Sequence, residues 1–324
     1  MTGRQFRLYF AWSRPAELGA ELGNIDNRFP ALFEFRRILW PEFAALADPV
    51  RHDQGIKGFV DDVILSDFAY FMDHIRAETG NVVRLAQRSS DALEARLDSE
   101  LLHDVDTLVV VSLDHLRTGQ TPTAAEVAAL ERFLADPDHS VIVCPHHDIG
   151  NVSDLPPEKQ LAEQEIEYRH HGDPTIPPEQ RFSGFGRMLL NGLGVPVENR
   201  FGLNPAKDEH GDPAPLEIDA AADRFHLLAG VNTFNLHPHL PHLDIPAQSA
   251  AKYDVLARQP INLAAPPHPF TQAGHRTFNA LLQARSPAFR GRLLVCDATL
   301  WSSAFGGLQS LQRFWTNLAQ LPRH

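Results

Sequence analysis

The chain has 324 residues, 43% of them hydrophobic and 22% charged, a composition typical of a globular protein and not of a fibrous or disordered one. The 29 basic and 41 acidic residues give a net charge of -12, which argues against nucleic acid as a partner because phosphate backbones repel such a surface. No apolar run approaches the roughly 18 residues that a membrane span needs, so no membrane partner is expected. Only two cysteines occur, and no secretion signal precedes the first apolar segment, so we expect a cytoplasmic protein with reduced thiols.

Strand-like and helix-like segments alternate in the first third of the chain. Short apolar runs indicate strands, and apolar residues at helical spacing indicate helices. In chain order we predict a strand at 6–12, helices at 32–46 and 63–78, a strand at 81–86 and a helix at 91–102.

The clearest unit follows at residues 106–144. Residues 106–113 form a continuous apolar run, as in a strand that is buried on both faces. Thr123 and Glu126 have the spacing of a capping box and open a predicted helix that runs to Leu134. Residues 140–144 form the next strand. Strand, helix and strand in this order predict a crossover connection and a parallel sheet.

The second half of the chain begins with a long polar segment. Residues 151–182 are rich in proline and lack periodicity, which predicts an irregular insertion or a lid. After it we predict a helix at 186–191, strands at 225–234 and 253–258, a helix at 278–282, a strand at 292–297 and a helix at 308–321.

Four segments, in this order, carry a family resemblance. They are the strand–helix–strand passage within 106–143, the sequence Leu-Leu-Asn-Gly-Leu-Gly-Val at 189–195, the pair His237-Pro238, and residues 291–297 with the helix around 314–318. Together they resemble the class I glutamine amidotransferase-like superfamily, especially its trehalose-utilisation-type branch without glutaminase motifs. The resemblance implies one α/β domain over residues 1–324, a flavodoxin-like three-layer sandwich with a mostly parallel central sheet, and a long polar insertion at 151–182.

One departure from this superfamily concerns the nucleophile. Its glutaminases carry a Gly-x-Cys-x-Gly elbow, because small residues allow the sharp turn that exposes the thiol. Here Cys144 has no flanking glycine and is followed by Pro145. Glutamine hydrolysis is therefore not expected of this chain.

A dense polar group follows the strand at 140–144. His146, His147 and Asp148 come directly after Pro145, where the carboxyl end of a parallel strand places ligand-binding residues. Imidazole and carboxylate groups carry protons near neutral pH and bind zinc, iron or manganese. The alternative is a polar loop whose histidines cap the next turn. Cys144 is either a thiolate nucleophile with one of these histidines as its base or a small buried hydrophobic residue.

A second histidine group lies at 237–242. His237 and His239 share a face of an extended segment, and His242 follows after a proline, so the three are candidate metal ligands. Eleven of the 17 histidines fall between His146 and His275, which supports a metal or acid/base role. A plain surface loop is the alternative.

Candidate substrate-binding residues follow three other strands. Asp114 and His115 follow the strand at 106–113, Asp297 ends the strand at 292–297, and Arg14 follows the first strand. Arginine can hold an anionic or sugar substrate through paired hydrogen bonds. Each of these residues also has a structural interpretation as a cap or an ion-pair partner. Neither a phosphate-binding loop nor a dinucleotide fingerprint is present in the sequence, so no nucleotide cofactor is expected.

Three functions remain open. The first is a hydrolase that acts on a small polar substrate with a divalent metal or histidine acid/base chemistry. The second is a covalent hydrolase or lyase that depends on Cys144, and the third is a non-catalytic module that binds a small molecule or carbohydrate. A homodimer is possible through the aromatic residues Phe29, Phe33, Phe35 and Trp40, although a buried helix explains them equally well.

Overall fold

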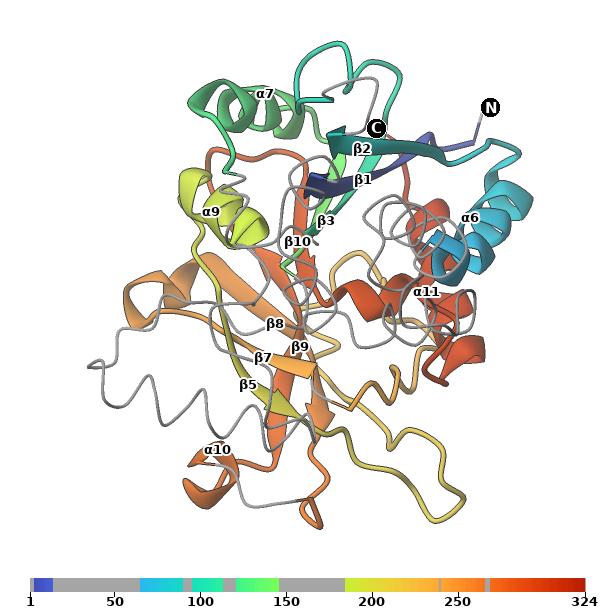
Figure 1. Ribbon diagram of the computed structural model, residues 1–324, viewed down its shortest axis with the longest axis vertical. Helices are drawn as coiled ribbons and strands as arrows, with labels where there is room; N and C mark the ends of the chain where they lie inside the picture. Colours follow the sequence, from blue (N-terminus) through green and yellow to red (C-terminus); the bar gives the residue numbers. More distant parts are fainter. Residues whose placement is uncertain are drawn as a thin grey trace, which may run out of the picture.

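The computed structural model describes residues 3–13, 65–89, 95–112, 121–145, 184–238, 240–265 and 269–323. Within these residues the protein has a mixed α/β fold, built around a large and mostly parallel sheet (Figure 1). None of the described helices combines the length and the apolar character that crossing a membrane requires.

The described part of the central sheet has eight strands. The first five in spatial order are parallel to their neighbours, and the remaining three add to the sheet in antiparallel pairs. Their order is β2 (Arg84–Ser89), β1 (Phe6–Ser13), β3 (Thr107–Ser112), β4 (Ser140–Cys144), β10 (Arg292–Cys296), β9 (Thr277–Ala284), β8 (Tyr253–Pro260) and β6 (Glu217–Ile218).

The predicted strand–helix–strand unit is confirmed as β3, α7 (Ala124–Leu134) and β4. Thr123 caps α7, because its hydroxyl accepts a hydrogen bond from the Glu126 backbone N–H while the Glu126 carboxylate accepts one from the Thr123 backbone N–H. This reciprocal pair satisfies two backbone donors that the first turn of a helix leaves without a partner. All residues of β3 and β4 are buried, as expected for central parallel strands.

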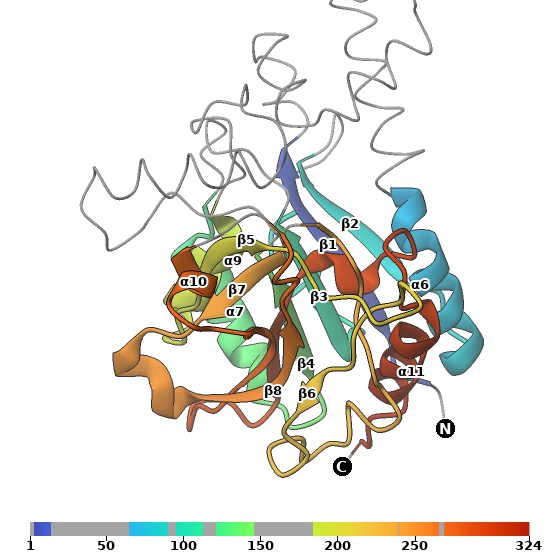
Figure 2. The same ribbon diagram turned by 90° about the horizontal axis from the view of Figure 1, so that it is seen from below.

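Helices cover both faces of the sheet (Figures 1 and 2). Successive residues of each central strand point to opposite faces, so that Val109 and Val111 join one core cluster while Leu108 and Val110 join the other. The first cluster includes α6 (Leu65–Thr79) and α11 (Leu308–Ala319), and the second includes α7 and α9 (Phe185–Gly192).

Gly186 brings α9 close to the carboxyl ends of β3 and β4. A Cβ atom at this position would lie 3.0 Å from the Cα of Pro145 and 3.4 Å from the Cβ of Ser112. The backbone N–H of Gly186 donates a hydrogen bond to the Ser112 hydroxyl over 3.2 Å. The absence of a side chain therefore permits this contact.

A second, two-stranded sheet lies beside the main one. It pairs β5 (Glu198–Leu203) with β7 (Leu240–Asp244) in antiparallel fashion. Three short helices complete the described fold, namely η4 (Ala247–Lys252), α10 (Pro269–Gln272) and η5 (Ala298–Trp301). The last of these directly follows the carboxyl end of β10.

Three predicted elements are wrong in the residues that the structure describes. Residues 225–234 form turns followed by irregular chain and not a strand. Asp223 accepts hydrogen bonds from two backbone N–H groups there, and His226 and Gly230 have positive φ angles of 54° and 71°. Residues 95–102 also form turns, where a helix was predicted. Residues 278–282 belong to strand β9 and not to a helix, because pairing with β8 and β10 satisfies their backbone groups.

Several other predictions fall on residues outside the described ranges. They are the helix at 32–46, the dimer face formed by Phe29, Phe33, Phe35 and Trp40, and the lid at 151–182. The single-domain organisation over residues 1–324 stays a prediction as well.

Candidate functional site

The carboxyl ends of the parallel strands meet at one edge of the sheet, where ligands bind in open α/β folds. Val295 on β10 lies opposite Val143 on β4, so the residues that follow the two strands emerge at the same level. Pro145 follows β4 there, and Asp297 follows β10. Seven predicted site residues lie outside the described ranges, namely Arg14, Asp114, His115, His146, His147, Asp148 and His239.

Asp297 begins the short helix η5 and is 5% exposed. Its Oδ1 atom accepts hydrogen bonds from the Thr299 backbone N–H over 2.9 Å and from the Thr299 hydroxyl over 2.6 Å. Burial raises the pKa of the Asp297 carboxyl to about 6, although these hydrogen bonds oppose the shift. A carboxyl group with such a pKa exchanges a proton near neutral pH, as a general acid or base must.

A buried chain of hydrogen bonds connects Asp297 to His237. The Thr299 hydroxyl accepts a hydrogen bond from Asn235 Nδ2 over 2.8 Å, and Asn235 Oδ1 accepts one from the His237 backbone N–H over 3.0 Å. Gln259 Nε2 donates to the Asn235 carbonyl over 2.6 Å. Two predicted site residues, from segments sixty residues apart, are thus joined through two residues whose importance the sequence did not reveal.

Asn235 and Thr299 are the functional candidates that sequence reasoning missed. Asn235 is fully buried and Thr299 is 5% exposed, which is unusual for polar side chains without a specific partner. Asp and Thr two residues apart, as at 297–299, are typical of a local cap, so the sequence could have indicated the contact between Asp297 and Thr299. Asn235 has no comparable signal, because its partners are distant in the sequence.

His237 is 8% exposed, and its ring packs edge-on against Phe305 at a centroid distance of 4.5 Å. His242 lies elsewhere, on β7, where its Nδ1 atom accepts a hydrogen bond from the Asn279 backbone N–H over 3.1 Å. Burial, together with the nearby His275 and two arginines, lowers the pKa of His242 to about 4, so this ring is neutral at pH 7.

The predicted metal ligands do not assemble within the described part of the chain. No group of three or more His, Cys, Asp or Glu side chains there is placed to hold a metal ion. His237 and His242 therefore do not form such a group with described neighbours. A metal site would depend on His146, His147 and His239, and it stays a prediction.

Cys144 ends β4 and its side chain is 0% exposed. Its Sγ atom accepts a hydrogen bond from the Trp301 indole N–H over 3.0 Å and lies 3.8 Å from the Sγ atom of Cys296. This environment matches the structural interpretation of Cys144 as a small buried residue. It gives no support to a nucleophilic role, because a substrate needs access to the sulfur.

Comparison with models of known protein families found no match for this chain, and comparison with curated proteins found none either. The superfamily resemblance stated above therefore stays a prediction.

Proposed function

We propose that this protein is a cytoplasmic hydrolase that acts on a small polar substrate at the carboxyl edge of the sheet. In this proposal the chain is a flavodoxin-like three-layer sandwich of the glutamine amidotransferase-like type. The observation that carries the proposal is Asp297, a buried carboxyl group at this edge with a pKa of about 6 and a hydrogen-bonded connection to the backbone N–H of His237.

Asp297 is the acid/base group in this proposal. Above pH 6 its carboxylate accepts a proton from an attacking water or from a substrate hydroxyl, and below pH 6 the carboxyl donates one. Thr299 and Asn235 hold it in place, because Thr299 donates to Oδ1 and is itself held by Asn235. Because the carboxyl group is already held in one orientation, it gives up little conformational freedom when the substrate binds.

The residues that follow the other parallel strands supply the rest of the proposed site. His146, His147 and Asp148 follow Pro145 directly, and we assign them to proton transfer. Asp114, His115 and Arg14 follow β3 and β1, and they are proposed to bind the polar groups of the substrate.

A divalent metal is a further part of the proposal. His146, His147 and His239 would hold it, with His237, two residues before His239, as the candidate ligand that the structure describes. The metal would polarise a carbonyl or activate a water. His242 is a poorer ligand, since its Nδ1 atom already accepts a hydrogen bond.

Plasma mass spectrometry of the untagged protein measures the number of metal ions bound per chain. We expect about one transition metal ion per chain, lost in His146→Ala and His239→Ala, whereas a metal-free protein after reconstitution with zinc, iron and manganese would contradict it.

The activity itself is tested with chromogenic esters, amides and glycosides at pH 7. We expect hydrolysis of one class, with kcat/KM lowered by about 100-fold or more in Asp297→Asn. Asp223→Asn is the matched control, because Asp223 is equally buried but accepts its hydrogen bonds from Leu227 and Leu228, in the turns after residue 222. Equal activities of the two variants would remove Asp297 from the mechanism. A wild-type protein that hydrolyses none of the substrates would favour the binding module.

A further inference from the structure

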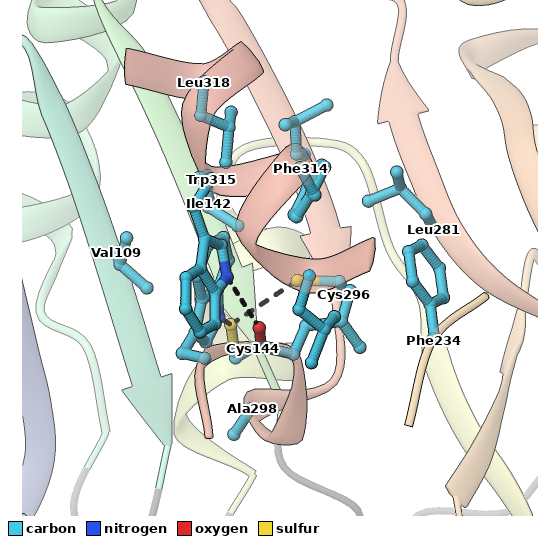
Figure 3. Packing of buried hydrophobic residues seen from close by; sticks show 14 of the residues in the cluster. Val109, Ile142, Cys144, Phe234, Leu281, Cys296, Ala298, Phe314, Trp315 and Leu318 are labelled. Atoms are coloured by element: carbon cyan, nitrogen blue, oxygen red, sulfur yellow. Dashed lines mark hydrogen bonds between the residues drawn. The ribbon is translucent and has the colours of Figure 1, made fainter. Parts of the chain in front are cut away.

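We propose that Cys144 and Cys296 form a buried dithiol which a small oxidant closes to an intramolecular disulfide. The two Sγ atoms lie 3.8 Å apart although the residues are 152 positions apart in the sequence. Figure 3 shows the two side chains facing each other within the packed core. This inference does not depend on the proposed function.

The strand register explains why the two thiols meet. β4 and β10 are parallel neighbours, and Val143 lies opposite Val295, so the next residues, Cys144 and Cys296, also lie side by side. Both side chains belong to the same core cluster and therefore point to the same face of the sheet. Neighbouring strands are about 4.8 Å apart, which falls within the Cα separation of about 4.4–6.8 Å found for disulfides. Closure then requires each sulfur to move by roughly 1 Å toward the other.

The surroundings keep the pair reduced until an oxidant reaches it. Both side chains are 0% exposed, so bulky thiol reagents are excluded. Burial, and then the neighbouring Cys144, raise the pKa of the Cys296 thiol well above its usual value. The indole N–H of Trp301 donates a hydrogen bond to the sulfur of Cys144 over 3.0 Å, whereas no such donor contacts the sulfur of Cys296 within the described part of the chain. Cys144 is accordingly the sulfur that reacts first.

The chemistry balances with a peroxide as the oxidant. With a peroxide, the two S–H bonds break, one S–S bond forms, and two protons and two electrons convert hydrogen peroxide to two waters. In the first step the Cys144 thiol takes one oxygen of the peroxide, becomes a sulfenic acid and releases one water. The Cys296 sulfur then displaces the hydroxyl group, which leaves with the second thiol proton as the second water.

Disulfide formation would act on the candidate site through two direct connections. Cys296 immediately precedes Asp297, and Trp301 ends the short helix that carries Thr299. Closure moves the Cys144 sulfur away from the indole N–H that now contacts it. The dithiol therefore lies directly beside the Asp297 carboxyl group and the helix that carries Thr299.

The experiment treats the native, fully reduced protein with hydrogen peroxide, removes the peroxide with catalase, quenches the reaction in acid, alkylates the denatured product and records its intact mass. We expect a monomer that has lost two hydrogens and takes up no alkylating reagent, and full reversal by dithiothreitol. Peptide mapping should place Cys144 and Cys296 in one cross-linked species. Trp301 fluorescence should change when the disulfide forms. The Trp301→Phe variant should lose this change, which separates the Trp301 signal from that of the other three tryptophans.

Cys144→Ala and Cys296→Ala are the matched variants, and each should keep one thiol that is alkylated after the same treatment. The wild-type measurement stands without them if either variant fails to fold. The proposal is overturned if both wild-type thiols remain alkylatable, if the product is a covalent dimer or an oxidant adduct, or if closure occurs only in denaturant. None of these results requires an activity, so they do not bear on the proposed hydrolase.

Discussion

Asp297 is subject to two opposing effects. The backbone and hydroxyl groups of Thr299 favour the carboxylate, whereas removal from water favours the neutral acid. Desolvation is the larger effect and brings the pKa to about 6, from the usual 3.8 of an aspartate side chain. The carboxyl group therefore retains its proton in the folded protein over a pH range in which the unfolded chain has lost it.

This difference predicts how stability depends on pH. Between pH 4 and pH 6 the folded state binds more protons than the unfolded state, so the free energy of unfolding decreases as pH rises. The shift of the Asp297 pKa from 3.8 to about 6 corresponds to a free energy of unfolding that is up to about 3 kcal/mol lower at neutral pH than below pH 4. Asp297→Asn removes this titration while keeping an oxygen that accepts from Thr299. Urea unfolding at several pH values should show that Asp297→Asn gains stability relative to wild type as the pH rises from 4 to 6. A difference in the free energy of unfolding that stays constant with pH would contradict the raised pKa of Asp297.

At the scale of single elements, Glu126 of helix α7 takes part both in the cap of its own helix and in an ion pair with Arg88. The Glu126 carboxylate accepts hydrogen bonds from Thr123 and from the Leu97 backbone N–H, and it also binds the guanidinium of Arg88. Arg88 and Glu126 are each 2% exposed. A residue that caps one helix thus also neutralises the buried arginine of strand β2.

Two substitutions separate these roles. Thr123→Ala removes only the cap and should lower the free energy of unfolding by about 1 kcal/mol. Glu126→Ala also leaves the Arg88 charge buried without its carboxylate and should lower it by about 3–5 kcal/mol. Glu131→Ala, at an exposed position of the same helix, is the control and should change stability by less than about 0.5 kcal/mol. Denaturant unfolding measures all three, and equal losses for Thr123→Ala and Glu126→Ala would contradict the ion-pair role.

The elements with strong local signals were predictable from the sequence. The capping box at Thr123, the apolar run of β3 and the Cys144 strand are confirmed within a residue or two of their predicted bounds. Strand β9 was not predictable, because Phe278, Leu281 and Leu282 have helical spacing and only pairing with β8 and β10 makes the segment extended. In the candidate site, Asp297 followed from its place after a strand, whereas its connection to Asn235 depends on tertiary contacts that no local pattern records.

At the scale of the whole molecule, one core cluster joins the ends of the chain to the sheet. The Phe71 ring on α6 lies 5.0 Å from the ring of Trp301 and 5.4 Å from that of Trp315 on α11. α6 and α11 lie side by side in both views (Figures 1 and 2). Segments from the first quarter and the last quarter of the sequence therefore form one layer over the strands that carry Cys144 and Cys296.

Phe71 provides a test of this shared layer. The side chain is 0% exposed, so Phe71→Ala should lower the free energy of unfolding by about 3–5 kcal/mol through lost burial and a cavity. Tyr70→Ala is the control, because the neighbouring Tyr70 is 51% exposed and its loss should have an effect below about 0.5 kcal/mol. Urea unfolding that follows Trp fluorescence compares the two, and similar losses would contradict the proposed contribution of the layer.

Strands β1, β3, β4 and β10 all end at the edge of the sheet where Asp297 lies. We propose that Asp297 transfers a proton during hydrolysis at this edge. The most direct measurement is the pH dependence of kcat/KM for wild type, Asp297→Asn and Asp223→Asn. We expect a change of slope near pH 6 in wild type and in Asp223→Asn that is absent in Asp297→Asn. A profile that keeps this change of slope when Asp297 is replaced would contradict the claim.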